Sequence, residues 1–121
     1  MDREPTLPEA ASQVLKPPPR VEHVLAAVAE ATGIPAQQIC GGDRSMEYRM
    51  ARQMYAWLCR EWTVASFPQI AAGIGRIHHS TTLDWTLSWP KSRLTCTNWQ
   101  ERAEMILATR FTRGGRLLKG R

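Results

Sequence analysis

The chain has 121 residues and a mass of 13.7 kDa, which suits one compact domain with short terminal segments and excludes a multidomain enzyme. It is 43% hydrophobic and 22% charged, so it is apolar enough to fold, yet no run of about 18 apolar residues could span a bilayer. Sixteen Lys and Arg oppose eleven Asp and Glu, and residues 91–121 hold eight of the positive side chains but only two of the negative ones. A basic terminus favours a polyanionic partner, although a solvated tail is the common alternative.

The first nineteen residues contain five of the eight prolines, which predicts a disordered, proline-rich segment over residues 1–19. This segment shows no apolar signal sequence, so we expect a cytoplasmic protein. The folded domain is expected over residues 20–111. Its first helix, over about 20–32, is predicted by apolar residues at i, i+3, i+4 and i+7: Val21, Val24, Leu25 and Val28. Gly33 ends that helix, and a short helical turn up to Cys40 precedes the break Gly41-Gly42-Asp43.

A longer helix is predicted over residues 46–63, and a spacing of 100° per residue sorts its side chains onto two faces. One face is predicted to be basic and exposed to solvent: Arg49, Arg52, Gln53, Ala56 and Arg60. The opposite face is predicted to join the core: Met50, Met54, Trp57, Leu58 and Trp62. Glu61 falls within the apolar face, where a carboxylate requires a buried partner or a position at the edge.

The next two helices form a helix-turn-helix pattern. Ser66-x-x-Gln69 is a capping box that opens a short helix to about residue 74, and Gly75 permits a tight turn. The second helix of the pair, over about 79–89, is expected to bury Leu83 and Leu87 and to end at Pro90.

The last helix is predicted over about 98–111, after a second capping box, Thr97-x-x-Gln100. Four of its apolar residues are expected to be buried: Trp99, Ala103, Ile106 and Leu107. Residues 112–121 are predicted to form a basic, flexible tail.

No pattern in the chain indicates catalysis. Phosphate-loop, zinc-protease and nucleophile-elbow motifs are all missing, and Gly73-x-Gly75 lacks the strand and the third glycine of a nucleotide-binding loop. Cys40, Cys59 and Cys96 have long separations, so we expect them to be reduced, with at least two buried. We therefore predict a protein without catalytic residues, metal, cofactor or bound nucleotide.

The polar run His79-Ser80-Thr81-Thr82 opens the second helix of the pair, where side chains of a DNA-binding helix-turn-helix reach base edges in the major groove. The competing interpretation, of equal weight from spacing alone, is that Ser80 and Thr81 only cap the helix. Arg44, in the loop after the glycines, could enter a minor groove or be an ordinary surface residue. The arginines of the long helix are, in the same way, either phosphate contacts or a solvated face.

Three stretches together resemble a known family: Arg52-Gln53 with Leu58, then Ser66-Phe67-Pro68-Gln69-Ile70, then His79-Ser80-Thr81-Thr82-Leu83. They are similar to the motifs R-Q-x-x-x-x-L, S-[LF]-P-x-I and D-H-[ST]-T-[VI]-L of the C-terminal DNA-binding domain of the bacterial replication initiator DnaA. The resemblance covers about residues 20–90. It implies an all-α, Trp-repressor-like helical bundle containing a helix-turn-helix that binds double-stranded DNA.

The resemblance also implies roles for individual residues. Arg44 matches the minor-groove arginine, Arg52 and Arg60 match phosphate contacts, and the start of the first helix of the pair matches a segment that grips the backbone: Ser66, Phe67 and Pro68. His79, Ser80 and Thr81 match the readers of the major groove. The candidate DNA-binding set is completed by Arg49, Arg76 and His78.

The chain departs from the family at Ile77 and His78, where the family has arginine and aspartate, so its base preference is expected to differ. We expect a nucleoid-associated protein that recognises sites like DnaA boxes and regulates replication or transcription without ATPase activity. The alternative is a degenerate helix-turn-helix that binds a replication or transcription protein, which an exposed Ile77 beside Trp85 would favour.

Overall fold

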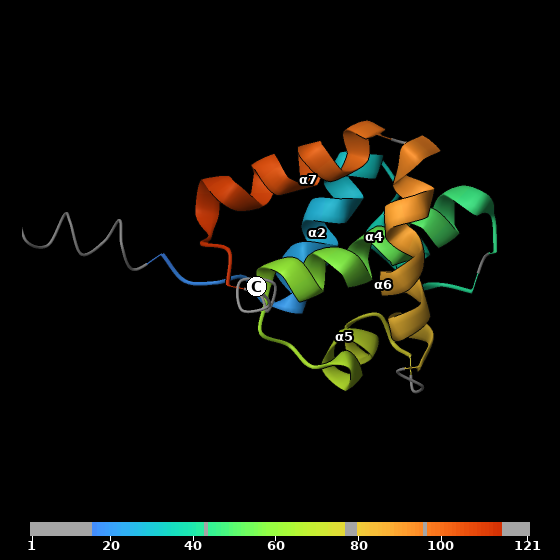
Figure 1. Cartoon of the computed structure of the whole chain (residues 1–121), viewed down its shortest axis with the longest axis horizontal. Helices are drawn as coiled ribbons and strands as arrows, with labels where there is room; N and C mark the ends of the chain where they lie inside the picture. The colour runs from blue at the N-terminus through green and yellow to red at the C-terminus, as the bar shows by residue number, and fades with distance from the viewer. Residues whose placement is uncertain (1–15, 43, 77–79, 96, 115–121) are drawn as a thin grey trace, which may run out of the picture.

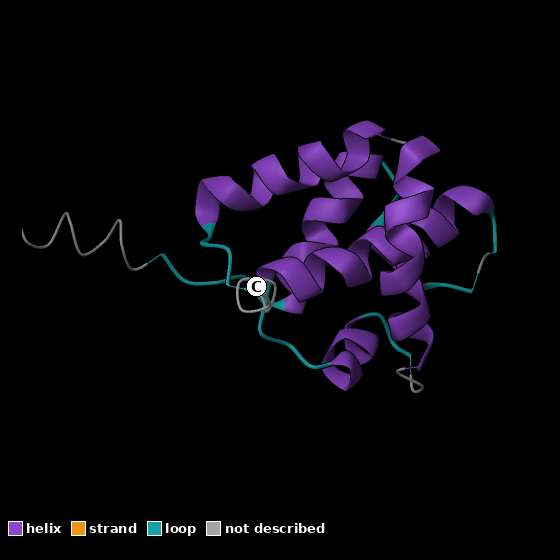
Figure 2. Ribbon diagram, viewed as in Figure 1, coloured by secondary structure: helices purple, strands orange, loops and turns teal. Residues whose placement is uncertain are grey.

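The computed structural model describes residues 16–42, 44–76, 80–95 and 97–114, and within these ranges the regular structure is entirely helical (Figure 2). The α-helices are α2 (Val21–Thr32), α3 (Ala36–Cys40), α4 (Met46–Trp62), α5 (Phe67–Gly73), α6 (Ser80–Ser92) and α7 (Thr97–Arg110), with a 3-10 turn at Arg93–Thr95. The predicted all-α class is confirmed. None of the described helices has the length and apolar character needed to cross a bilayer.

Helix α4 is the centre of the bundle, and the helices α2, α3, α5 and α6 all pack against it (Figure 1). Helix α7 lies along α2. The predicted core face of α4 is confirmed at Met54, Leu58 and Trp62, whereas Met50 and Trp57 are half-buried. The glycine signals are also confirmed, since Gly33 and Gly75 adopt the left-handed φ angles of 79° and 75°.

The start of α5 is held by the predicted capping box. The Ser66 amide donates to Gln69 Oε1 at 2.8 Å, and the Gln69 amide donates to Ser66 Oγ at 3.4 Å. These two bonds satisfy amides that a helix of this length leaves without an internal partner. The first helix of the helix-turn-helix therefore begins at a position fixed by its own sequence.

The predicted orientation of α6 is wrong. Leu83 and Leu87 are 42% and 69% exposed, whereas Thr82 and Trp89 are fully buried. Thr82 and Trp89 are seven residues apart, so both lie on one face of the helix, and that face packs against the body of the domain. Pro90 does not end the helix, which continues to Ser92, because Pro90 lies in the last turn and removes only one amide donor.

The end of α6 is tied to α7 by a buried tryptophan. The Trp89 indole N–H donates to Gln100 Oε1 at 3.0 Å, and Arg93 donates to the same oxygen at 3.2 Å. Gln100, which was predicted to cap α7, thus has its carboxamide oxygen turned toward α6. In α7 itself Ala103 and Leu107 are buried as predicted, and Trp99 and Ile106 are half-buried.

The two ends of the described chain are joined, contrary to the predicted boundaries. The Thr112 amide donates to the Pro17 carbonyl at 3.0 Å, and the Gly114 amide donates to the Trp62 carbonyl at 3.1 Å. Lys16 Nζ also reaches the Ala108 carbonyl at 3.2 Å. Residues 16–19 and 112–114 therefore belong to the folded unit, whereas the rest of the predicted linker and tail lies outside the described residues (Figure 1).

Glu61 is buried and has a charged partner, Arg113, that is itself only partly buried. Glu61 is 6% exposed and forms an ion pair with Arg113, whose guanidinium lies 3.8 Å from Glu104 and 5.4 Å from the centre of the Trp62 ring. Burial raises the pKa of Glu61 above its usual range, while the charge of Arg113 opposes that rise. The pair thus fastens the C-terminal segment to the end of α4.

This pair predicts a pH-dependent stability. The pKa of Glu61 is raised in the folded state, so this group contributes most to the free energy of unfolding at low pH. That contribution is lost as the pH rises from about 4.5 through the raised pKa of the folded state. Replacing Arg113→Met raises that pKa further, so we expect a loss of about 1 to 2 kcal/mol at pH 8 and a smaller loss at pH 5. The loss is modest because Arg113 is 37% exposed.

Urea unfolding of the wild type and of Arg113→Met at both pH values measures this difference. The control is Arg110→Met, which removes an exposed arginine at the end of α7. Equal losses at pH 5 and pH 8 would show that Arg113 acts through packing and not through the Glu61 charge.

Candidate nucleic-acid interface

The helix-turn-helix is formed by α5 and α6, which contact each other across the turn at Gly75. Helix α6 begins at Ser80, whose side chain is exposed, and Thr81 is half-exposed, whereas Thr82 faces the core. Ser80 and Thr81 are therefore available at the first turn of the second helix, as predicted. Ile77, His78 and His79 lie outside the described residues, so their predicted roles stay predictions.

The start of α5 forms a second part of the candidate surface. Pro68 is exposed, while Ser66 and Phe67 are half-buried. The guanidinium of Arg60, on α4, lies 4.4 Å from the centre of the Phe67 ring. This stacking brings Arg60 to the start of α5, so four of the five residues that the resemblance assigns to the DNA backbone lie in one cluster, without Arg52.

Arg44 and the beginning of α4 form a third part. Arg44, Arg49, Arg52 and Trp85 line a hollow of about 370 Å³ between the loop after α3 and helix α6. Arg44 and Arg49 are exposed. The two exposed arginines beside the hollow create a positive potential that favours a phosphate group. The hollow thus lies between the loop predicted to enter the minor groove and α6, the helix predicted to enter the major groove.

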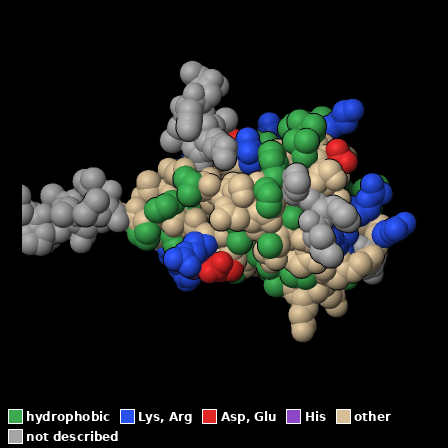
Figure 3. Space-filling model, turned by 90° about the horizontal axis from the view of Figure 1, so that it is seen from below, with side chains coloured by type: hydrophobic (Ala, Val, Ile, Leu, Met, Phe, Trp, Pro, Cys, Tyr) green, Lys and Arg blue, Asp and Glu red, His purple; other side chains and the backbone are tan. Residues whose placement is uncertain are grey.

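Trp85 was not among the predicted site residues. It lies four residues after Thr81, so both side chains lie on neighbouring positions of the same helical face. That spacing could have indicated its place beside the site. In the space-filling view from below, Lys and Arg side chains lie mainly toward the edges of the face, with hydrophobic side chains between them (Figure 3).

Arg52 corrects the predicted solvent-exposed basic face of α4. It is only 4% exposed, and its guanidinium donates from Nε to the Ile39 carbonyl at 2.8 Å and from an Nη to the Gly41 carbonyl at 2.9 Å. Gln53 and Ala56 on the same face are also buried. The reason is that α3 and the helix-turn-helix cover this side of α4, which only the tertiary packing reveals. A phosphate contact by Arg52 stays a prediction.

Arg76, also in the candidate set, is half-buried and has backbone partners. Its two Nη atoms donate to the Cys40 and Gly41 carbonyls, both at 2.8 Å. Gly41 therefore accepts hydrogen bonds from two arginines that come from different parts of the chain. Neither Arg52 nor Arg76 presents the freely solvated guanidinium that a simple phosphate contact would have.

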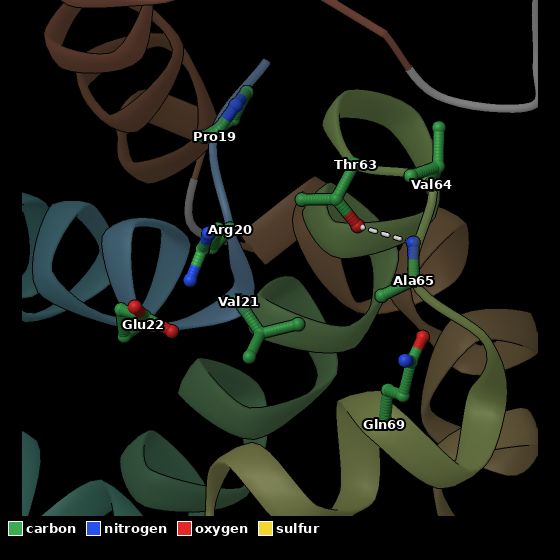
Figure 4. A pocket seen from close by; sticks show the side chains of 8 residues that line it. All are labelled: Pro19, Arg20, Val21, Glu22, Thr63, Val64, Ala65 and Gln69. Atoms are coloured by element: carbon green, nitrogen blue, oxygen red, sulfur yellow. Dashed lines mark hydrogen bonds between the residues drawn. The ribbon is translucent and has the colours of Figure 1, made fainter. Parts of the chain in front are cut away.

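A separate hollow, also of about 370 Å³, lies between the start of α2 and the loop before α5 (Figure 4). Its lining mixes Arg20 with Glu22, and the Ala65 amide donates to Thr63 Oγ1 at 3.1 Å beside it. With one positive and one negative side chain in its lining, the hollow has no strong preference for an anion. Among the described residues there is also no cluster of three His, Cys, Asp or Glu that could hold a metal ion. Cys59 is buried and Cys40 half-buried, while Cys96 lies outside the described residues.

Comparisons with known proteins match the same region. Residues 21–84 match the family described as the bacterial dnaA protein helix-turn-helix. The chromosomal replication initiator protein DnaA of Pelobacter propionicus is 36% identical over 63 residues, which are 52% of this chain and 14% of that protein. The DnaA protein of Corynebacterium jeikeium is 31% identical over 62 residues, which are 51% of this chain and 11% of that protein.

The matched region runs from α2 to the first half of α6, so it contains the loop with Arg44, the long helix, α5, the turn and the start of the second helix of the helix-turn-helix. The chain spans a small part of the length of these relatives. The helix-turn-helix of this family is a DNA-binding module and not a catalytic one. The chain belongs to the bacterial DnaA helix-turn-helix family.

Proposed function

We propose that this protein binds double-stranded DNA sequence-specifically, at sites like DnaA boxes, with α6 in the major groove and Arg44 in the adjacent minor groove. The observation that carries the proposal is the exposure of Ser80 and Thr81 at the first turn of α6, beside the hollow lined by arginines. Hydroxyl groups there can exchange hydrogen bonds with base edges, while the arginines attract the backbone.

We further propose that Arg60, Ser66, Phe67 and Pro68 contact the backbone at the start of α5. The stacking of Arg60 on Phe67 supports this role, because it orients the cation next to the start of α5, beside the exposed Pro68. The protein would act without enzymatic activity, as a regulator of replication initiation or of transcription at its sites. Binding is then expected to be unchanged by added ATP.

A gel-shift titration at physiological salt tests the proposal, with one duplex that carries a DnaA box and one with the same bases scrambled. The box duplex should bind more tightly. Equal affinity for both duplexes would refute sequence-specific binding and would favour the alternative, a module that binds a replication or transcription protein.

The variant Thr81→Ala tests the major-groove contact. We expect it to reduce the discrimination between the two duplexes by about 1 to 3 kcal/mol, because one base contact is lost while the phosphate contacts remain. Ser88→Ala, an exposed position further along α6, is the matched control and should change nothing. If Thr81→Ala weakened both duplexes alike, Thr81 would contact the backbone and not a base.

A further inference from the structure

The end of α3 is held by two arginines that come from different elements. Three successive carbonyls, those of Ile39, Cys40 and Gly41, accept four hydrogen bonds from Arg52 and Arg76 at distances of 2.8 to 2.9 Å. The last carbonyls of a helix have no partner within the helix and carry a partial negative charge, so a guanidinium is well suited to them. Here two guanidiniums meet on one of these oxygens, Gly41 O.

Both arginines are themselves fixed. Arg52 lies in the middle of α4 and is 4% exposed, so its side chain has little room to move. The Arg76 amide donates to the Ala71 carbonyl at 2.9 Å, which secures its backbone to the C-terminal end of α5 just after the Gly75 turn. One arginine therefore connects the α3 carbonyls to the central helix, and the other connects them to the turn of the helix-turn-helix.

The held segment leads directly into the predicted minor-groove loop. Gly41 is followed by Gly42, and Arg44 comes two residues after that. Two consecutive glycines give a loop high conformational entropy, which would have to be lost each time Arg44 enters a groove. A fixed carbonyl at Gly41 limits that freedom in advance.

We propose, on the basis of the proposed DNA-binding function, that Arg52 and Arg76 are positioning residues. They place the loop that carries Arg44 at a set distance from the start of α6, so that the minor-groove and major-groove contacts are made together. Arg76 acts through its two carbonyl partners and not as a phosphate contact.

The variants Arg76→Lys and Arg76→Gln separate these two roles. Lysine keeps the positive charge but loses the planar fork that reaches two carbonyls at once. A positioning role predicts that both variants weaken binding to the box duplex by about tenfold, a size typical of coupled contacts. A phosphate role predicts that lysine retains most of the affinity. Arg102→Gln is the matched control. Arg102 also donates to a backbone carbonyl, that of Ala31 at 3.0 Å, but it lies on α7, outside the helix-turn-helix and the loop that carries Arg44.

Double variants show which contact Arg76 supports. In an Arg44→Ala background, Arg76→Gln should cost less than about twofold, since the loop no longer carries the contact that Arg76 positions. In a Thr81→Ala background it should still cost about tenfold. An equal cost in both backgrounds, or rescue by lysine, would overturn the proposal.

Hydrogen exchange of the amides in residues 41–45, measured without DNA, provides a readout that does not depend on binding. It should become faster in Arg76→Gln and stay unchanged in Arg102→Gln. Unchanged exchange in Arg76→Gln would also overturn the proposal. A wild-type protein that does not discriminate between the box and scrambled duplexes refutes the proposed function instead, whatever the exchange result.

Discussion

Replacing Trp89→Ala is expected to lower the free energy of unfolding by about 3 to 5 kcal/mol, the usual cost of removing a large, fully buried aromatic side chain. Trp89 is fully buried among α4, α6 and α7, and its indole N–H is bonded to Gln100. The substitution leaves a cavity and removes the bond that joins α6 to α7. For a domain of this size, such a loss is a large fraction of the total stability.

Leu87→Ala is the matched control, on the same helix and two residues away. Because Leu87 is 69% exposed, its replacement should change the unfolding free energy by no more than about 0.5 kcal/mol. Thermal and urea unfolding of both variants measure the difference. A larger cost for Leu87→Ala than for Trp89→Ala would mean that α6 is turned as its apolar spacing first predicted.

The case of α6 shows where pattern reasoning from the sequence reaches its limit. The helix carries two apolar sets, Leu83 with Leu87 and Trp85 with Trp89, and both have the i, i+4 spacing of a buried stripe. Which set faces the core depends on the surface that α4 and α7 offer. Thr82 is buried on the same side of the helix as Trp89, but it is polar. A count of hydrophobic residues therefore does not identify this side as the buried one.

The long helix shows a success and a failure of the same kind of reasoning. The position of Glu61 in the apolar arc predicted either a buried partner or a position at the edge, and the structure shows a partner, Arg113, that nothing local identified. Arg52 was assigned to solvent because its neighbours are polar, yet its partners are backbone carbonyls of α3. The pattern of side chains in a sequence does not show which backbone carbonyls will be available as acceptors. The position of Arg52 was therefore not predictable from residue spacing.

Signals that arise within a few residues were predictable. The capping box at Ser66, the left-handed glycines at Gly33 and Gly75, and the helix-turn-helix they delimit all depend on local chemistry. The resemblance added Arg44, Ser80 and Thr81 to a common surface, and the structure places these residues in the loop and the helix that the resemblance assigns. Their contacts with DNA stay predictions.

Gly73 shows that a glycine can be required for packing without any unusual backbone angle. A Cβ atom built on Gly73 would overlap the Tyr55 hydroxyl and approach Val21 Cγ2 to 2.9 Å. That hydroxyl is buried and donates to the Ile70 carbonyl at 2.6 Å, so it cannot simply move aside. The sequence pattern Gly73-x-Gly75 therefore reflects two different needs: close contact between α5 and its neighbours at the first glycine, and a left-handed turn at the second.

We expect Gly73→Ala to lower the free energy of unfolding by about 2 to 4 kcal/mol, because overpacking is added to the loss of a buried hydrogen bond. Gly42→Ala is the matched control, since a Cβ there meets nothing within 4 Å, and it should be neutral or slightly stabilising. Adding Tyr55→Phe to Gly73→Ala removes the overlapping hydroxyl, so the double variant should lose less stability than the sum of the two single losses. Additive losses in urea unfolding would show that Gly73 and Tyr55 are not in contact, and the placement of α5 against α4, on which the helix-turn-helix depends, would be wrong.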